Sequence, residues 1–196
     1  MTYPRNVGPT YAPGEYAPGG YGLEQASGGG GGSSAEAIVW QDVSVNLTDT
    51  DGTLEKVSGG TSFNSGAWST KGFTGDGAVT WVMVSTAYYV CVGVGVVDGS
   101  DSNADVDFNV RMTSSGTAQG HEGTSVKGSS WAYTATTEFK VERIGTTITI
   151  YDRDGVDEWT SRHQFVTEST GTLHCDNSIA GIGGKITGAT IDGDLV

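Results

Sequence analysis

The sequence predicts an all-β protein, a two-sheet antiparallel jelly-roll sandwich that follows an extended N-terminal arm. Apolar and polar residues alternate with period two in several stretches after residue 36, as they do in strands with one buried face. Glycine, at 32 of 196 residues, separates these stretches, and no window of a dozen residues has a helical period. Many short strands joined by glycine-rich turns favour a sandwich over an alternation of strands and helices.

Residues 1–36 form the predicted arm. Tyr-Ala-Pro-Gly occurs twice there, beginning at Tyr11 and at Tyr16, and a run of glycines follows. Few apolar side chains are available to offset the entropy of ordering, so the composition favours a linker or a disordered tail. If the arm is ordered, burial against neighbouring subunits is the simplest cause, because tyrosine supplies a large contact area. The candidate anchors are Tyr3, Tyr11, Tyr16 and Tyr21.

The sandwich is expected to span residues 37–196. Residues 39–52 alternate in hydrophobicity and end in an Asp-Gly pair, which is typical of a tight hairpin turn. Residues 78–84 and 88–97 are apolar on both faces and predict central strands of a two-layer structure. Residues 104–116 alternate strictly, which predicts a strand with one face in water.

A meander of three strands is expected over residues 137–161. Turns are predicted at the Gly-Thr pair 145–146 and at the Asp-Gly pair 154–155. At the second turn, two residues with positive φ would close a tight hairpin. The nearby Asp152 is then expected at a solvated strand end.

The order of these features resembles the concanavalin A-like lectin/glucanase jelly roll, in the divergent form found in phage structural and appendage proteins and in bacterial surface proteins. The resemblance covers residues 38–191 and lies in the stretches VW, WST, GDGAVTW, VGVGVVD and EFKVERIGTTITIYDRDGVDEWTS. The hairpin and core positions that match are Arg143, Gly145, Ile148, Tyr151, Gly155 and Ser161. This resemblance implies the fold, but a fold alone does not establish an activity.

Calcium is the one cofactor that the sequence raises, because alternating acidic residues can supply its oxygen ligands. The stretch from Asp152 begins like an EF-hand loop, yet His163 stands where the twelfth position needs glutamate. A second loop, DGSDSNADVD, contains more carboxylates. Its candidate ligands are Asp98, Asp101, Asn103 and Asp105. The alternative is a polar loop and strand edge without an ion, and no other cofactor is expected.

No enzymatic activity is expected from the sequence. Glucanases of the resembled fold use two acids about 5 Å apart on a Glu-x-Asp-x-x-Glu strand. Asp105 and Asp107 project together, but no glutamate takes part and no third acid follows. His121, His163 and His174 are too dispersed for a zinc site or a catalytic triad, and are expected on the surface or in loops.

Two groups of aromatic residues have different expected roles. Trp40, Trp81 and Trp159 lie in strand-like contexts and are expected in the core. The other group lies in Gly/Ser-rich stretches, where an exposed ring can stack on a sugar or, alternatively, close an end of the sandwich. The candidates for sugar contact are Trp68, Trp131 and Tyr133.

The charge balance excludes some classes of partner. With 23 acidic against 10 basic residues, the formal net charge is -13. Nucleic acid is therefore a poor partner and an anionic membrane surface is disfavoured. The first residues lack the basic and apolar regions of a secretory signal, and no apolar run of 18 residues occurs, so no export address is expected. Cys91 and Cys175 are expected either as buried free thiols or as one disulfide.

Taken together, these features favour a non-enzymatic structural protein of a virus particle, most simply of a tailed phage. Its arm, residues 1–36, would attach to other virion subunits in a multicopy or homo-oligomeric assembly. Its lectin-like domain would face outward and bind a cell-surface glycan. A tail fibre, a head fibre or spike, and a capsid decoration all fit. The alternative is a bacterial surface or secreted carbohydrate-binding module.

Overall fold

The computed structural model describes residues 34–97 and 99–196. These residues form strands and no α-helix, which confirms the all-β prediction. The described residues therefore contain no helix that could cross a membrane. The strands are β1 (Glu36–Ala37), β2 (Trp40–Gln41), β3 (Leu47–Thr50), β4 (Thr53–Lys56), β5 (Gly66–Met83), β6 (Val90–Gly95), β7 (Phe108–Met112), β8 (Thr117–Glu122), β9 (Ser125–Ala132), β10 (Thr137–Ile144), β11 (Thr147–Asp154), β12 (Thr160–Gln164), β13 (Leu173–Ile179) and β14 (Lys185–Leu195).

Most of the expected arm lies outside the described residues. The same holds for its four candidate anchors, Tyr3, Tyr11, Tyr16 and Tyr21. A linker, a disordered tail and an attachment arm therefore all stay predictions. Within the described residues, the first strand pairing is at Glu36, which lies opposite Ile191 of β14.

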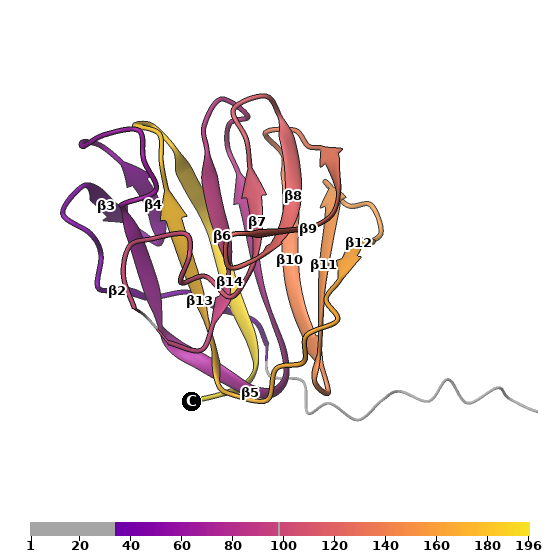
Figure 1. Ribbon diagram of the computed structural model, residues 1–196. Coiled ribbons are helices and arrows are strands. Elements are labelled where there is room, and N and C mark those ends of the chain that lie inside the picture. Colours follow the sequence, from indigo (N-terminus) through magenta and orange to yellow (C-terminus); the bar gives the residue numbers. More distant parts are fainter. Residues whose placement is uncertain (1–33, 98) are drawn as a thin grey trace, which may run out of the picture. The chain divides into compact units, whose positions relative to one another are not determined.

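The strands form two layers that share the long strand β5 (Figure 1). Residues 66–73 of β5 pair with β13, whereas residues 77–83 lie between β10 and β14. The first sheet runs β2-β5-β13-β6-β7-β8-β9, and the second runs β12-β11-β10-β5-β14-β4-β3, with β1 also on β14. Gly75 has a φ of 64°, a left-handed conformation that glycine adopts without strain, at the point where β5 passes between the sheets.

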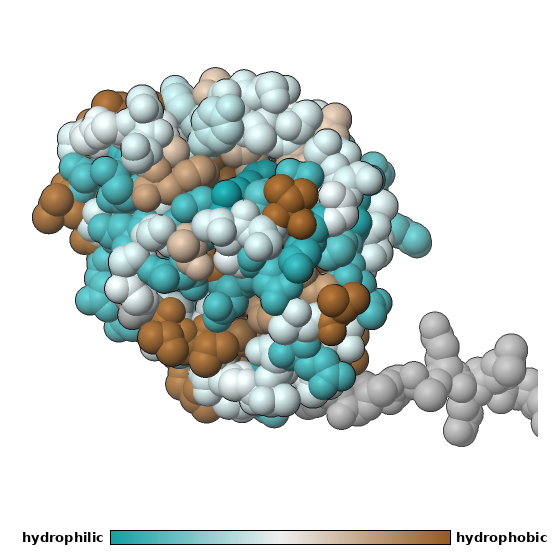
Figure 2. All heavy atoms as spheres, viewed as in Figure 1, coloured by the Kyte–Doolittle hydropathy of each residue, from teal (hydrophilic) through white to brown (hydrophobic). Residues whose placement is uncertain are grey.

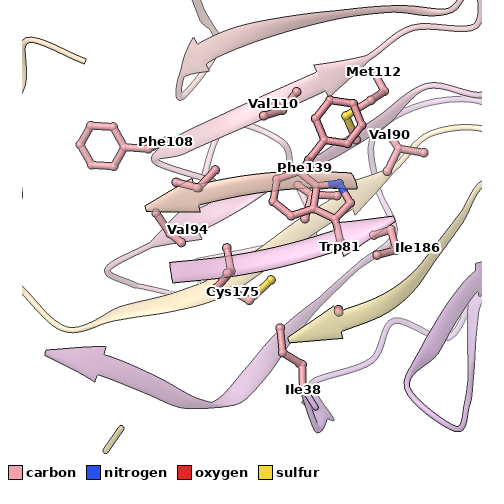
Figure 3. Packing of buried hydrophobic residues seen from close by; sticks show 14 of the residues in the cluster. Ile38, Trp81, Val90, Val94, Phe108, Val110, Met112, Phe139, Cys175 and Ile186 are labelled. Atoms are coloured by element: carbon pink, nitrogen blue, oxygen red, sulfur yellow. The ribbon is translucent and has the colours of Figure 1, made fainter. Parts of the chain in front are cut away.

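The core lies between the sheets and follows the period-two pattern. In β10, Phe139 and Val141 are buried, while Glu138, Lys140 and Glu142 are only half-buried. Trp81 of β5 stacks on Phe139 with a distance of 5.7 Å between ring centroids. Figure 3 shows Val90 and Met112 of the first sheet in the same cluster. Burying each such side chain contributes roughly 1.5–3 kcal/mol, so this shared cluster holds the layers together.

Strand β6 is buried on both faces, as its sequence predicts. Val92 and Val94 belong to the core, and Cys91, on the opposite face, is also fully buried. The connection between β6 and β7 covers that outer face. Its Asp101 carbonyl oxygen accepts a hydrogen bond from the Ser178 hydroxyl of β13 at 2.6 Å.

Two of the predicted turns are confirmed. Asp51 and Gly52 have φ values of 52° and 78° and join β3 to β4 in a two-residue hairpin. Both residues need positive φ in such a turn, which an Asp-Gly pair tolerates. Ile144 and Thr147 lie opposite each other around the turn at Gly145, whose φ is 62°.

The tight hairpin predicted at Asp154-Gly155 is wrong. Gly155 has a φ of 61°, but Asp154 does not have positive φ, and β12 begins only at Thr160. The Asp154 carboxylate accepts a hydrogen bond from Thr137 at 2.6 Å, which keeps this residue within the β10–β11 ladder. The chain therefore turns in a longer loop. Trp159, which was expected in the core, lies half-buried in that loop.

Asp152 and Arg143 are among the buried charged side chains of the described residues. Asp152 was expected at a solvated strand end, but it is 2% exposed and accepts a hydrogen bond from Arg162 Nε at 2.7 Å. Arg143 is 1% exposed, and its guanidinium donates to the carbonyl oxygens of Gly75 and Gly171, both at 2.5 Å. Arg143 thus ties the bend of β5 to the segment before β13.

The cysteines are buried free thiols, the first of the two alternatives. Cys91 lies opposite Ser178 and Cys175 lies opposite Val94 in the β6–β13 ladder. Because Cys175 and Ser178 are three positions apart on one strand, the two thiols point to opposite faces of the first sheet.

Candidate functional site

A pocket of about 240 Å³ lies on the outward face of the first sheet. Strands β7 and β8 supply its floor, and Arg111 lies opposite Gln119 in their antiparallel ladder. Thr113 follows Arg111 by two residues and His121 follows Gln119 by two, so alternation brings four polar side chains to one face. The pocket is lined by Phe63, Tyr89, Arg111, Thr113, Gln119 and His121.

Arg111 is fixed by neutral partners and by a ring. Its Nη2 donates to the carbonyl oxygen of Gly123 at 2.9 Å. In the amide orientation that satisfies both groups, the Asn103 side-chain oxygen lies 2.8 Å from Nη2 and 2.9 Å from Nη1. The guanidinium carbon lies 5.8 Å from the ring centroid of Phe63, within the range of a cation–π contact. The cation is therefore held in place before any ligand arrives.

His121 is a neutral group at physiological pH. It is 6% exposed, and burial together with the Arg111 charge lowers its pKa to about 4. Its Nδ1 lies 3.4 Å from the carbonyl oxygen of Thr124, which can only accept a hydrogen bond. Nδ1 therefore carries the proton, and Nε2 is left as an acceptor.

Two aromatic side chains line the pocket beside this polar row. Phe63 comes from the connection between β4 and β5, and Tyr89 directly precedes β6. Tyr89 is 48% exposed, and its carbonyl oxygen accepts a hydrogen bond from the Ala180 N–H at 3.0 Å. The face of the domain seen in Figure 2 is mostly hydrophilic, with its hydrophobic residues in small groups, so that face lacks a large apolar docking patch.

This arrangement is suited to a small polar ring. The aromatic side chains offer apolar area, Arg111 donates, the Gln119 amide donates and accepts, and His121 Nε2 accepts. A few convergent polar groups beside apolar rings are the usual composition of a small-molecule pocket.

Trp68, predicted to contact sugar, is not an exposed ring. It lies on β5, is 6% exposed, and stacks on His174 with ring centroids 4.6 Å apart. The indole also reaches β6, since a Cβ built at Gly95 would lie 3.4 Å from it. Trp68 therefore packs across three strands of the first sheet, away from the pocket.

The other two predicted contacts also support the domain without lining the pocket. Trp131 of β9 packs against the core cluster, with Arg162 5.9 Å from its ring centroid. Tyr133 is 6% exposed and packs edge-on against Phe139. Its hydroxyl donates to the Thr113 carbonyl oxygen at 3.2 Å, so it supports the rim of the pocket from behind. The three predicted aromatic residues are not brought together.

Three of the four predicted calcium ligands have partners within the protein, and the calcium site stays a prediction. Asp101 accepts a hydrogen bond from one serine hydroxyl and Asp105 from another, while the Asn103 oxygen faces the Arg111 cation. Asp98 lies outside the described residues. Within the described part of the chain, no group of three or more His, Cys, Asp or Glu side chains is placed to hold a metal ion. The acidic loop is instead held by protein donors.

The histidines were expected on the surface or in loops; His121 is instead buried, whereas His163 and His174 are partly exposed. All three occupy strands: His121 in β8, His163 in β12 and His174 in β13. His163 packs edge-on against Phe165, with ring centroids 4.8 Å apart. Of the two acids weighed for catalysis, Asp107 accepts a hydrogen bond from the backbone N–H of Val96 at 2.9 Å.

Sequence reasoning missed all six residues that line the pocket. The polar alternation in residues 109–121 was the available signal, because the turn at residues 114–116 sets Arg111 opposite Gln119. Nothing in the sequence indicated that Phe63 and Tyr89, from distant segments, would meet this row.

Comparison with known proteins supports the fold. No family model and no curated protein sequence matches the chain. Its fold is similar to that of the VIP36 exoplasmic/lumenal domain in a Ca²⁺/Man3GlcNAc-bound form, with a TM-score of 0.56, 9% identity and coverage of 82% of this chain and 83% of that one. The TRIM65 PSpry domain is similar with a TM-score of 0.57, 8% identity and coverage of 80% and 90%.

The stonustoxin structure is similar with a TM-score of 0.56 and 13% identity. The match covers 81% of this chain but only 28% of the stonustoxin chain. At these identities the likeness concerns the fold alone. The domain has the two-sheet sandwich of lectin-like and SPRY domains, which confirms the predicted jelly roll.

Proposed function

We propose that the domain is a lectin-like, non-catalytic saccharide-binding module and that the pocket over β7 and β8 is its binding site. The observation that carries the proposal is the convergence of Phe63 and Tyr89 with the polar row Arg111, Gln119 and His121. The fold adds support, since the similar VIP36 domain was solved with a bound glycan.

The chemistry of a sugar ring matches this pocket. A pyranose presents an apolar C–H face and a rim of hydroxyl groups, each of which can donate and accept. Three or four hydrogen bonds of about 1 kcal/mol each, with one aromatic contact, amount to roughly 4–5 kcal/mol and a Kd of about 0.2–1 mM. An affinity this low becomes useful when several copies of the domain bind one surface together.

A glycan array with the full-length chain tests the proposal. The matched variants are Gln119→Ala in the pocket and Gln164→Ala in a cavity of about 310 Å³ on the second sheet. We expect Gln119→Ala to lose at least about tenfold in binding and Gln164→Ala to bind like the parent protein. Absence of binding to any glycan overturns the function. Loss with Gln164→Ala alone overturns the choice of pocket.

From the sequence we further propose that residues 1–36 attach the domain to a multicopy assembly. A virion fibre, spike or capsid decoration is the preferred setting, and a bacterial surface or secreted carbohydrate-binding module is the alternative. Deletion of residues 1–33 tests the attachment, because it leaves β1 intact. We expect the truncated chain to remain folded and to lose its place in the assembly. Full occupancy by the truncated chain would refute the role of the arm.

A further inference from the structure

Lys56, the last residue of β4, carries an ammonium group that is out of contact with solvent. Its side chain is 0% exposed. Nζ lies 2.8 Å from Asn64 Oδ1, 3.0 Å from the carbonyl oxygen of Ile179 and 3.1 Å from that of Ser62. Each of its three donors therefore has an acceptor, and all three acceptors are neutral. Burying an ammonium group is costly unless its donors are satisfied in this way.

Two of the three oxygen atoms belong to the segment that carries Phe63, and the third belongs to the end of β13. Ser62 and Asn64 flank Phe63 in the chain. The N–H of Ile179 donates to the Ser65 carbonyl oxygen at 2.7 Å, which closes the same segment onto β13.

Tyr89 is connected to Lys56 through the end of β13. Ile179 accepts from the Lys56 ammonium, and the N–H of the next residue, Ala180, donates to the Tyr89 carbonyl oxygen at 3.0 Å. One buried cation thus reaches the backbone beside both aromatic residues.

We infer that the Lys56 ammonium acts in place of a bound metal ion: it gathers three oxygen atoms and thereby positions Phe63 and Tyr89, so that the pocket needs no calcium. Lys56 is a positioning residue and does not line the pocket. That the pocket binds a saccharide rests on the proposed function. The role of the Lys56 ammonium can be tested without a ligand.

The loop between β6 and β7 is held according to the same principle. There the Arg111 guanidinium faces the side-chain oxygen of Asn103, one of the residues that the sequence suggested for calcium. In each of the two loops, a covalently attached cation thus lies against a side-chain oxygen of an asparagine, Asn64 in one and Asn103 in the other.

The first experiment compares Lys56→Met with Lys185→Met. Lys185 lies on the neighbouring strand β14 and forms a partly exposed ion pair with Glu55, so it controls for loss of a lysine. We expect Lys56→Met to lower the Tm by about 6 °C or more. We also expect backbone amides in residues 57–65 to exchange about tenfold faster or more. Lys185→Met should change neither, and equal behaviour of the two variants overturns the inference.

The second experiment separates a cation role from simple packing. In Lys56→Ala, methylammonium or potassium chloride should raise the Tm with concentration, whereas tetramethylammonium chloride at the same ionic strength should not, because it cannot donate hydrogen bonds or enter the cage. No difference between these salts overturns the inference. For the parent protein, calcium or EDTA should leave the Tm unchanged, and a rise with calcium refutes independence from metal.

Asn64→Leu keeps the inference testable if the Lys56 variants do not fold, because Asn64 is exposed. It removes one oxygen atom of the cage and should speed exchange in residues 57–65. Unchanged exchange overturns the inference. A negative glycan array together with rescue by methylammonium would refute the proposed function and leave the role of Lys56 standing.

Discussion

Replacement of Arg143 by methionine tests whether the bend of β5 is held by a buried cation. Arg143 Nε and Nη1 donate to the carbonyl oxygens of Gly75 and Gly171 at 2.5 Å, and Nη2 lies 3.4 Å from the carbonyl oxygen of Phe73. Methionine keeps most of the buried volume but donates no hydrogen bond. The variant therefore leaves the two closely bonded carbonyl oxygens without their donors.

The magnitude follows from those two short bonds. Hydrogen bonds to a charged donor contribute about 1.5–3 kcal/mol each, and relief from burying the guanidinium offsets part of the loss. We expect Arg143→Met to lower the free energy of unfolding by about 3 kcal/mol. For a domain of this size, that corresponds to a fall in Tm of about 6–12 °C. The stability of Arg143→Lys should lie between those of the parent protein and Arg143→Met, because one ammonium group cannot reproduce the planar arrangement of donors on a guanidinium.

Chemical denaturation and a thermal melt measure both quantities. Arg153→Met is the matched control, since Arg153 pairs with Glu138 at 2.6 Å while its side chain is 31% exposed. A partly exposed ion pair contributes little, so we expect a loss of about 1 kcal/mol or less. If Arg143→Met were no more destabilising than Arg153→Met, the reasoning about the bend would be refuted.

Three further predictions concern His121, the cysteines and Gly93. The pKa of His121 in the folded state, about 4, lies below its ordinary value of 6.5, so the stability from neutral His121 is present above pH 6.5 and lost between pH 6.5 and 4. The free energy of unfolding should therefore depend less on pH in His121→Asn than in the parent protein, by no more than about 3 kcal/mol between pH 6.5 and 4. The same pH dependence in both proteins would contradict this prediction. Burial raises the pKa of Cys91 and of Cys175, so neither thiol should react with dithionitrobenzoate before unfolding; rapid labelling of the folded protein would show the burial to be wrong. Gly93→Ala would place Cβ 2.0 Å from the Phe108 carbonyl oxygen and should cost about 1–3 kcal/mol or more, whereas Gly60→Ala meets nothing within 4 Å and should be near neutral by the same unfolding measurement.

Much of the fold was accessible from local pattern. The alternation in residues 104–116 predicted β7 correctly, but the face predicted to be in water is covered, since Asn109 is fully buried and Arg111 is half-buried. The Asp-Gly pair at 51–52 predicted a two-residue hairpin correctly. The same pair at 154–155 did not, because the Thr137 side chain binds Asp154 and extends the ladder. A distant partner therefore outweighed the local preference for a turn.

The candidate site was much less accessible. Sequence reasoning favoured tryptophan in glycine-rich stretches, yet Trp68 is buried against His174. It left the acids around Asp101 open as metal ligands or as a polar loop, and the structure shows that the Ser44 hydroxyl donates to the Asp101 carboxylate. Whether an aromatic or an acidic side chain is available to a ligand depends on residues that pack around it from distant parts of the chain.

The sequence by itself determined which residues favour strands, which faces are apolar and where glycine permits positive φ, because sterics and alternation act between adjacent residues. Only the tertiary structure decided that β5 serves both sheets, that Lys56 lies buried among three oxygen atoms, and that Phe63 and Tyr89 line a pocket with Arg111. Those outcomes depend on packing between segments far apart in the chain. Their physical origin is the summed burial and hydrogen bonding of the whole sandwich, to which no short stretch of sequence gives access.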